Sequence, residues 1–209
     1  MIVIIDYGRN NVRSVRHAFL SIGAEAEISS DPHRVRNASG LVLPGVGSFS
    51  SGVGALRTRG LASAIREAVN QGRALLGICL GMQMLFESSE EGGSGDEVDA
   101  EGLCLLPGRM QRFSQGLKVP HIGWNRVCDV KPGGLMAGLE GAYMYFVHSY
   151  YLPLTWEPGT AAVTEYGVPF VSVMQKANII GTQFHPEKSG AQGMEVIRRF
   201  KEIVESGAL

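Results

Sequence analysis

Several features that mark special classes of protein are scarce in this sequence. The 209 residues include three cysteines, too few and too scattered for a disulfide framework, so a reducing, cytoplasmic location is expected. The apolar runs are short and mostly interrupted by glycine, which excludes a membrane-spanning helix. Nineteen Lys and Arg against twenty Asp and Glu give a net charge of −1, so nucleic-acid binding is not expected. The apolar stretch at the start is five residues long without a basic flank, and it predicts a strand rather than a signal peptide.

What is present is the composition of a globular domain, with 44% hydrophobic and 19% charged residues. Strands are predicted at 2–5, 25–28, 40–43 and 74–78, the third ending at Pro44-Gly45, with amphipathic helices between them. This alternation is typical of a parallel sheet with helices on both sides. Residues 88–102 are acidic and predict a mobile loop. After it, short strands predict antiparallel pairing, the first of them at LCLL (103–106), and a final helix is expected near 192–204.

These patterns predict a fold class and a domain organisation. We expect one α/β domain over residues 1–209, with a mixed, largely parallel central sheet flanked by helices and an added antiparallel strand region. Asn10 or Asn11 is expected to cap the first helix.

The most informative segment is G-x-C-x-G, Gly77 to Gly81, between a predicted strand and a predicted helix that carries Met82, Leu85 and Phe86 on one face. This is the cysteine form of a nucleophile elbow, in which a tight turn requires small residues on either side. The turn presents Cys79 at the carboxyl end of the sheet, and the adjacent helix N-terminus favours its thiolate. The backbone amide of Leu80 would point into the site and could hold an oxyanion. The alternative is that Cys79 is simply a small buried residue.

A thiol nucleophile requires a base, and His185 is the best candidate among five histidines. Pro186 fixes its backbone at the end of an apolar strand, and Glu187 can orient the imidazole as the third member of a triad. On its own, this segment would favour a His-Pro turn with a surface glutamate, but together with Cys79 it favours the triad. The glycine-rich turn at residues 43–48 could offer further amides to an anion, or could be only a tight turn.

Together, GICLGMQ (77–83) and FHPE (184–187) resemble the triad (class I) glutamine amidotransferases. Within that class, four segments are similar to the glutaminase subunits of imidazole glycerol phosphate synthase. They are IDYGRNNVRSV near the start, LPGVGSF, HIGWN at 121–125, and YFVHSYY at 145–151 leading into QFHPEKS at 183–189. The resemblance spans nearly the whole chain.

The resemblance implies hydrolysis of glutamine to glutamate and ammonia without a cofactor or metal. It also implies a one-to-one heterodimer with a (βα)₈-barrel cyclase subunit. The cyclase uses the ammonia to make imidazole glycerol phosphate and aminoimidazole carboxamide ribotide in histidine biosynthesis.

The resemblance further implies roles for individual residues. The catalytic residues would be Cys79, His185 and Glu187, and the oxyanion donors would be the amides of Val46 and Leu80. The glutamine pocket would include Gly45, Gln83, Glu91, Ser149 and Tyr150. The partner interface would include His121, Trp124, Asn125, Tyr145 and Lys188.

Three alternatives remain open at this stage. The chain could be a glutaminase for another synthase, or a small cysteine hydrolase that uses the same elbow without a partner. It could also be a non-enzymatic scaffold that keeps the elbow but only binds or regulates another protein.

Overall fold

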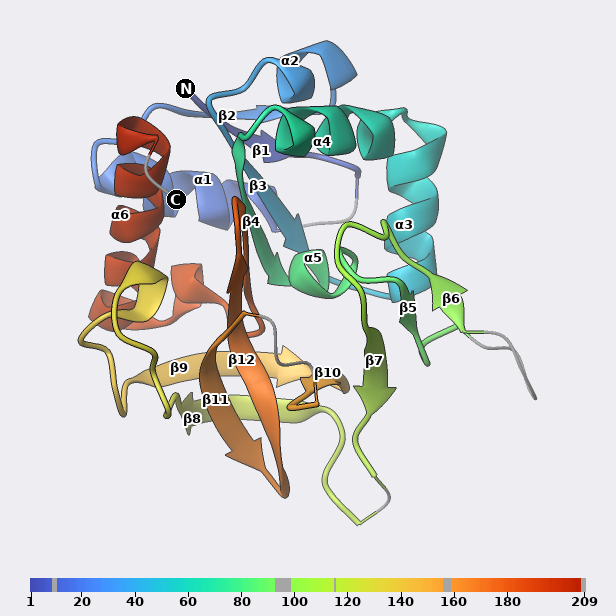
Figure 1. The fold of residues 1–209 in the computed structure, drawn as a ribbon, viewed down its shortest axis with the longest axis vertical. Coiled ribbons are helices and arrows are strands. Elements are labelled where there is room, and N and C mark those ends of the chain that lie inside the picture. Colours follow the sequence, from blue (N-terminus) through green and yellow to red (C-terminus); the bar gives the residue numbers. More distant parts are fainter. Residues whose placement is uncertain (9–10, 93–98, 115, 156–158, 208–209) are drawn as a thin grey trace.

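Five parallel strands form one half of the larger sheet. The computed structural model describes residues 1–8, 11–92, 99–114, 116–155 and 159–207 (Figure 1). In spatial order, the parallel strands are β2 (Ala26–Ser29), β1 (Ile2–Ile5), β3 (Gly40–Gly45), β4 (Ala74–Cys79) and β13 (Ile179–Thr182). Their carboxyl ends therefore share one edge, where β4 delivers Cys79 and β13 leads into His185.

Antiparallel strands extend the sheet beyond β13. They are β12 (Val168–Lys176), β10 (Tyr150–Pro153) and β7 (Arg109–Arg112), with β11 (Thr160–Tyr166) paired to β12. The short strands β5 (Ser88–Ser89) and β6 (Ala100–Glu101) complete the edge, β5 running parallel to β7. Separately, β8 (His121–Arg126) and β9 (Tyr143–His148) form a two-stranded antiparallel sheet. The expected fold class is therefore confirmed.

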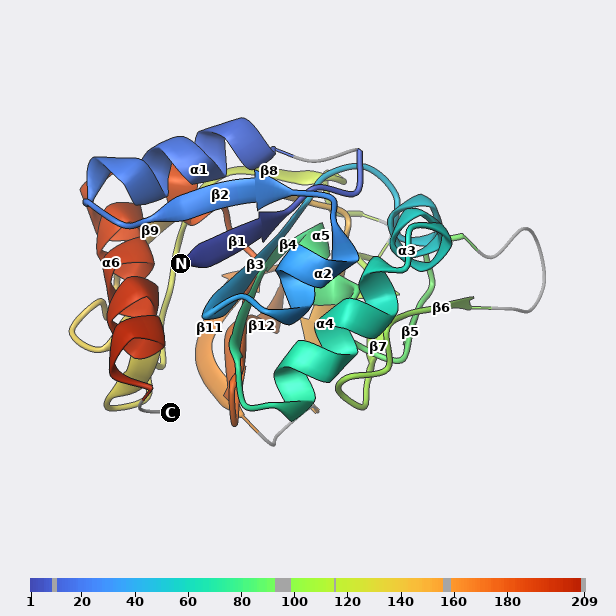
Figure 2. The same cartoon turned by 90° about the horizontal axis from the view of Figure 1, so that it is seen from above.

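Helices cover both faces of the parallel strands, as Figure 2 shows. One face carries α1 (Val12–Ser21) and α6 (Gly190–Ser206), and the other carries α2 (Pro32–Arg36), α3 (Phe49–Thr58) and α4 (Leu61–Asn70). The remaining helical segments are α5 (Leu80–Gln83), η1 (Gly134–Met136) and η2 (Pro186–Lys188). Neighbouring residues of β3 face opposite layers, Leu41 toward α3 and α4 and Val42 toward α1 and α6. Burial on both sides explains why these strands are continuous apolar runs.

The third strand is longer than predicted. It continues through Pro44 to Gly45, which pairs with Cys79 of β4. A proline is tolerated there because β1 pairs with β3 only as far as Val42, so one side of the strand is free of β1 at Pro44. The extension brings the glycine-rich turn directly beside the elbow.

The segment after the elbow also differs from the prediction. The helix α5 is a single turn, and the chain continues in tight turns, with the amides of Leu85 and Phe86 bonded to residues three positions earlier. The LCLL segment at 103–106 is not a strand, because its amides bond to carbonyls of residues 84–86 rather than to a neighbouring strand. The segment is rich in leucine because these side chains fill the core beneath α3 and α4, and not because the segment belongs to a sheet.

The predicted mobile loop at 88–102 is ordered at both ends, where β5 and β6 pair. Its middle, residues 93–98, lies outside the described residues. Among the described helices, none combines the length and apolar character needed to cross a membrane.

Candidate active site

The elbow predicted around Cys79 is present. Cys79 has φ +53°, a strained value for a residue other than glycine. A Cβ at Gly81 would lie 1.8 Å from the carbonyl oxygen of Leu43, and one at Gly77 would lie 2.7 Å from the Cα of Met82. Because backbone atoms fill both places, only glycine fits on either side of the turn. The strain and the two glycines together present the thiol at the strand end.

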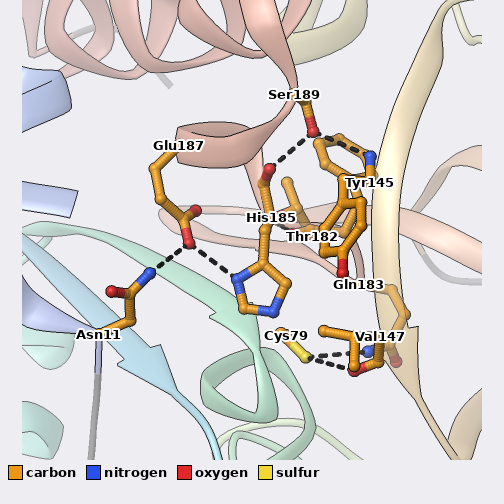
Figure 3. Close-up of polar contacts among 10 residues, drawn as sticks. Asn11, Cys79, Tyr145, Val147, Thr182, Gln183, His185, Glu187 and Ser189 are labelled. Atoms are coloured by element: carbon orange, nitrogen blue, oxygen red, sulfur yellow. Dashed lines mark hydrogen bonds and ion pairs between the residues drawn. The ribbon is translucent and has the colours of Figure 1, made fainter. Parts of the chain in front are cut away.

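His185 and Glu187 approach Cys79 from the other end of the chain, as Figure 3 shows. The imidazole Nδ1 and Glu187 Oε1 lie 2.8 Å apart, and both side chains are almost fully buried. Glu187 Oε1 also accepts a hydrogen bond of 2.9 Å from Asn11 Nδ2. The Nε2 of His185 lies on the side of the ring that faces Cys79 and has no hydrogen bond among the described residues. The three expected triad residues thus converge, with the ring held by Glu187.

The electrostatics favour a charged imidazole beside the sulfur. Burial opposes protonation of His185, but the negative charge of Cys79 and the hydrogen bond and charge of Glu187 outweigh it. Together they raise the pKa of His185 to about 10. The helix after Cys79, α5, is a single turn and therefore has little macrodipole, unlike the helix end expected from the sequence.

The pocket beside Cys79 has a volume of about 270 Å³. This is slightly below the range for drug-sized ligands and suits a smaller substrate. Four of the expected substrate residues line the pocket: Gln83, Glu91, Ser149 and Tyr150. Both expected oxyanion residues, Val46 and Leu80, and His185 also line it. Gly45 is not among the described residues that line the pocket. A Cβ there would lie 2.5 Å from the nitrogen of Gly81, so Gly45 serves the close packing of β3 against the elbow.

Glu91 could have been only a solvated charge in the acidic loop. Instead, its Oε2 accepts a 2.8 Å hydrogen bond from the amide of Phe49 at the start of α3. Burial raises its pKa, and the Phe49 amide partly offsets that effect. The carboxylate is therefore held in place at the pocket wall.

The glycine-rich turn at the pocket rim is open. Val46 is 39% exposed, and Gly47 has φ +100° with free space around it. The Val46 amide is close enough to the buried Tyr7 hydroxyl to favour its ionised form. Burial and the charge of Cys79 raise the pKa of Tyr7 more strongly. Because its two glycines let the peptides of this turn reorient at low steric cost, we expect the Val46 amide to face away from the site in the free chain.

Three of the expected interface residues meet on one surface. The rings of Trp124 and Tyr145 are 6.1 Å apart, edge to face, and Lys188 Nζ lies 5.9 Å from the Tyr145 ring centre. Trp124 is 56% exposed, so it does not fill the core of this chain. Ile122 and Tyr143, on the same two strands, are also more than half exposed. Sequence reasoning did not single out these last two residues.

His121 does not fit its expected place on the interface, because its side chain is buried. Its ring stacks on Tyr166 at 4.0 Å, and its Nδ1 lies 3.1 Å from Nε2 of His148. Asn125 is partly exposed, with its amide bonded to the carbonyl of Glu165 and 3.3 Å from His121 Nε2. Strand alternation turns His121 inward while its neighbours Ile122 and Trp124 are exposed.

Asn11 is the clearest functional residue that sequence reasoning misjudged. It occupies the N-cap position of α1, but its side chain makes no capping bond and donates instead to Glu187. The sequence did contain a signal, since Asn11 lies in the IDYGRNNVRSV segment that carries part of the family resemblance. Its partner lies 176 residues away, so the sequence did not reveal the contact.

Comparison with known proteins agrees with this geometry. The family model for class-I glutamine amidotransferases matches residues 3–203. The imidazole glycerol phosphate synthase subunit HisH of Moorella thermoacetica is 47% identical over 97% of this chain and 95% of its own length. The subunit of the same name from Methanothermobacter thermautotrophicus is 45% identical over 98% and 99%.

Solved structures show the same fold at lower identity. A glutamine amidotransferase crystal structure has a TM-score of 0.76 at 20% identity, covering 98% of this chain and all of that one. PurLQS from Thermotoga maritima has a TM-score of 0.71 at 20% identity, covering 95% and 96%. With its elbow, its converging His185 and Glu187, and full-length relatives near 45% identity, the chain belongs to the class-I glutamine amidotransferases and, among them, to the HisH subunits of imidazole glycerol phosphate synthase.

Proposed function

We propose that this chain hydrolyses glutamine to glutamate and ammonia with Cys79 as nucleophile, His185 as acid and base, and Glu187 as the group that orients His185. The observation that carries the proposal is the convergence of a strained, pocket-facing Cys79 with an imidazole held 2.8 Å from a fully buried carboxylate. Family membership supports the same reading.

The geometry supports the following sequence of steps. The Cys79 thiolate attacks the side-chain carboxamide carbon of glutamine, and His185 gives its proton to the departing ammonia. The resulting thioester is attacked by water, whose proton passes to His185 while the second water hydrogen stays on the new carboxyl group. Breaking the C–S bond releases glutamate and restores the thiolate.

Backbone amides would stabilise the tetrahedral oxyanion. Leu80 follows the nucleophile directly, as in other elbows, and Val46 lines the same pocket. The Gln83 side chain donates both of its amide hydrogens, to the Tyr150 carbonyl and to Gln183. Its own oxygen is therefore the group that it can present to an N–H of the substrate, beside Glu91, Ser149 and Tyr150.

We further propose that the ammonia passes to a (βα)₈-barrel cyclase subunit in a one-to-one heterodimer in the cytoplasm. The cyclase makes imidazole glycerol phosphate and aminoimidazole carboxamide ribotide. The apolar surface formed by exposed Ile122, Trp124 and Tyr143 with half-buried Tyr145 supports a docking face, because soluble proteins rarely expose clustered large apolar side chains without a partner. Lys188 adjoins this surface one residue past Glu187, so a contact there would close the site next to the chemistry.

The test of the chemistry is Cys79→Ser in the complex with the cyclase. Glutamine-dependent synthesis is expected to fall to background, while synthesis from added ammonium is expected to persist, because only the first reaction needs the nucleophile. Cys104→Ser is the matched control, since Cys104 is an exposed free cysteine outside the pocket. Loss of both activities in Cys79→Ser would contradict the assigned role.

The test of the docking face is Trp124→Ala and Lys188→Ala. Both are expected to leave the fold of the free chain intact. They should weaken cyclase binding roughly 5- to 30-fold, or lower the ratio of ammonia used to glutamine hydrolysed. Leu20→Ala is the matched control, because Leu20 is 43% exposed on α1 and lies outside this surface. Unfolding of the free Trp124→Ala chain with unchanged coupling in the complex would contradict the placement.

A further inference from the structure

Gln183 lies between the pocket and the nucleophile, and the reaction scheme above gives it no role. It follows β13 directly, is fully buried, and precedes His185 by two residues. Its Nε2 lies 3.8 Å from the Cys79 sulfur, a contact marked by a dashed line in Figure 3. Its Oε1 accepts a 3.0 Å hydrogen bond from Gln83 Nε2. The side chain thus joins the substrate pocket to the sulfur.

The neighbours determine which end of the Gln183 amide faces the sulfur. Gln83 Nε2 has two hydrogens, one donated to the Tyr150 carbonyl at 2.9 Å and the other to Gln183. If the Gln183 amide were turned over, its NH₂ would oppose the NH₂ of Gln83. The nitrogen of Gln183, and not its oxygen, therefore faces Cys79.

Besides His185, the carbonyl of Val147 and the side-chain amide of Gln183 contact the sulfur among the described residues, and their preferences are opposite. The carbonyl oxygen of Val147 lies 3.6 Å away and can only accept, so it favours the protonated thiol. The Nε2 of Gln183 can only donate, so it favours the thiolate. When the proton moves from Cys79 to His185, the Val147 contact becomes unfavourable and the Gln183 contact becomes stronger.

We propose that Gln183 is a positioning residue that holds the Cys79 thiolate by a hydrogen bond from its side-chain amide, with its orientation imposed by Gln83. This inference rests on the proposed nucleophilic role of Cys79. It adds a second stabilising group to the imidazolium of His185. Because Gln183 carries no charge, its contribution does not titrate with pH.

Several titratable groups also face this region and must be separated from Gln183 in any test. His185 faces the sulfur, backed by Glu187, and Tyr7 and His148 approach from the ends of β1 and β9. Glu91 and Tyr150 line the far wall of the pocket. All of them are kept unchanged, and Gln183→Met adds no titratable group, so a changed pH profile in that variant reports on the sulfur and its amide donor.

The experiment measures the rate at which iodoacetamide alkylates Cys79 in the intact chain between pH 5 and pH 10, followed by mass spectrometry of the peptide that contains Cys79. Replacing Gln183 with Met keeps the length of the side chain and removes the donor. We expect the midpoint of the profile to rise by about one pH unit, with a roughly tenfold lower rate near pH 6. Gln71→Met, at an exposed position after α4, is the control and is expected to leave the profile unchanged.

A second variant covers the case in which Gln183→Met does not fold. Gln183→Glu keeps an oxygen acceptor for Gln83 but places an oxygen at the sulfur, so it should raise the midpoint at least as far. Profiles that superimpose on that of the unchanged chain would overturn the role of Gln183. If Cys79 in the unchanged chain reacts no faster than the exposed Cys104, the proposed nucleophile itself fails, and this inference fails with it.

Discussion

Asn11 determines what happens when the carboxylate of Glu187 is replaced by an amide. In Glu187→Gln, the amide oxygen can keep both bonds, accepting from Asn11 Nδ2 at 2.9 Å and His185 Nδ1 at 2.8 Å. The opposite orientation would set an NH₂ against both donors. The NH₂ then takes the place of Oε2, which has no hydrogen-bond partner among the described residues. We therefore expect His185 to keep its Nδ1–H tautomer and the variant to lose only the charge.

The expected magnitudes follow from these contacts. A hydrogen bond to a charged group contributes about 1.5–3 kcal/mol and a neutral one about 0.5–1.5 kcal/mol. Glu187→Gln should thus cost about 1–2 kcal/mol, or roughly 5- to 30-fold in kcat/KM. Asn11→Ala removes one donor from the buried carboxylate and should cost a similar amount. In the double variant nothing prevents the amide from turning over, so the imidazole takes the wrong tautomer. In a serine protease triad such a change costs roughly 10⁴-fold.

The assay is a double-mutant cycle on glutamine hydrolysis in the complex with the cyclase. Synthesis from ammonium serves as the control for folding and assembly in all four proteins. A loss in the double variant at least tenfold beyond the product of the single losses is expected, and ¹⁵N NMR of His185 should show the tautomer change only there. Losses that multiply to within about twofold would refute the role of Asn11 as the group that orients position 187.

Three further predictions concern stability and the pocket rim. Burial lowers the pKa of His121 to about 4 and that of His148 to about 3, so both stay neutral when folded. At these two positions, only the unfolded chain gains protons as the pH falls below 6.5. Each of these two histidines should therefore lower the free energy of unfolding by about 2 kcal/mol by pH 5. In His148→Asn, the free energy of unfolding measured with urea should depend less on pH than in the unchanged chain. Turning over the peptide that carries the Val46 N–H rotates φ of Val46 toward positive values, at a cost of roughly 1–2 kcal/mol. Val46→Gly should therefore raise glutamine turnover by the free chain roughly 5- to 30-fold, and unchanged turnover would contradict a flipped resting peptide. Gly81→Ala, whose Cβ would lie 1.8 Å from the Leu43 oxygen, should not yield a folded chain with an alkylatable elbow, as circular dichroism and iodoacetamide labelling would show.

The outline of the fold could be predicted because it depends on local patterns. Continuous apolar runs such as residues 2–5 and 74–78 identify strands covered on both faces, and the intervening helices show their buried stripe directly in the spacing of apolar residues. The same patterns failed at LCLL and after the elbow. There the apolar residues fill the core from irregular backbone, so burial gives no indication of secondary structure.

The sequence by itself was enough to identify the cysteine and the histidine that we propose as nucleophile and base. Gly77 and Gly81 around Cys79, and Pro186 and Glu187 after His185, act over two residues, so their consequences can be derived locally.

Only the tertiary structure decided the contacts between residues that lie far apart in the sequence. It set the donation from Asn11 to Glu187, the inward side chain of His121, the bond from Glu91 to α3 and the contact of Gln183 with the sulfur. These contacts depend on how strand ends and loops meet at one edge of the sheet. The arrangement of these strand ends and loops is determined by packing over the whole domain, and no local pattern of residues indicates it.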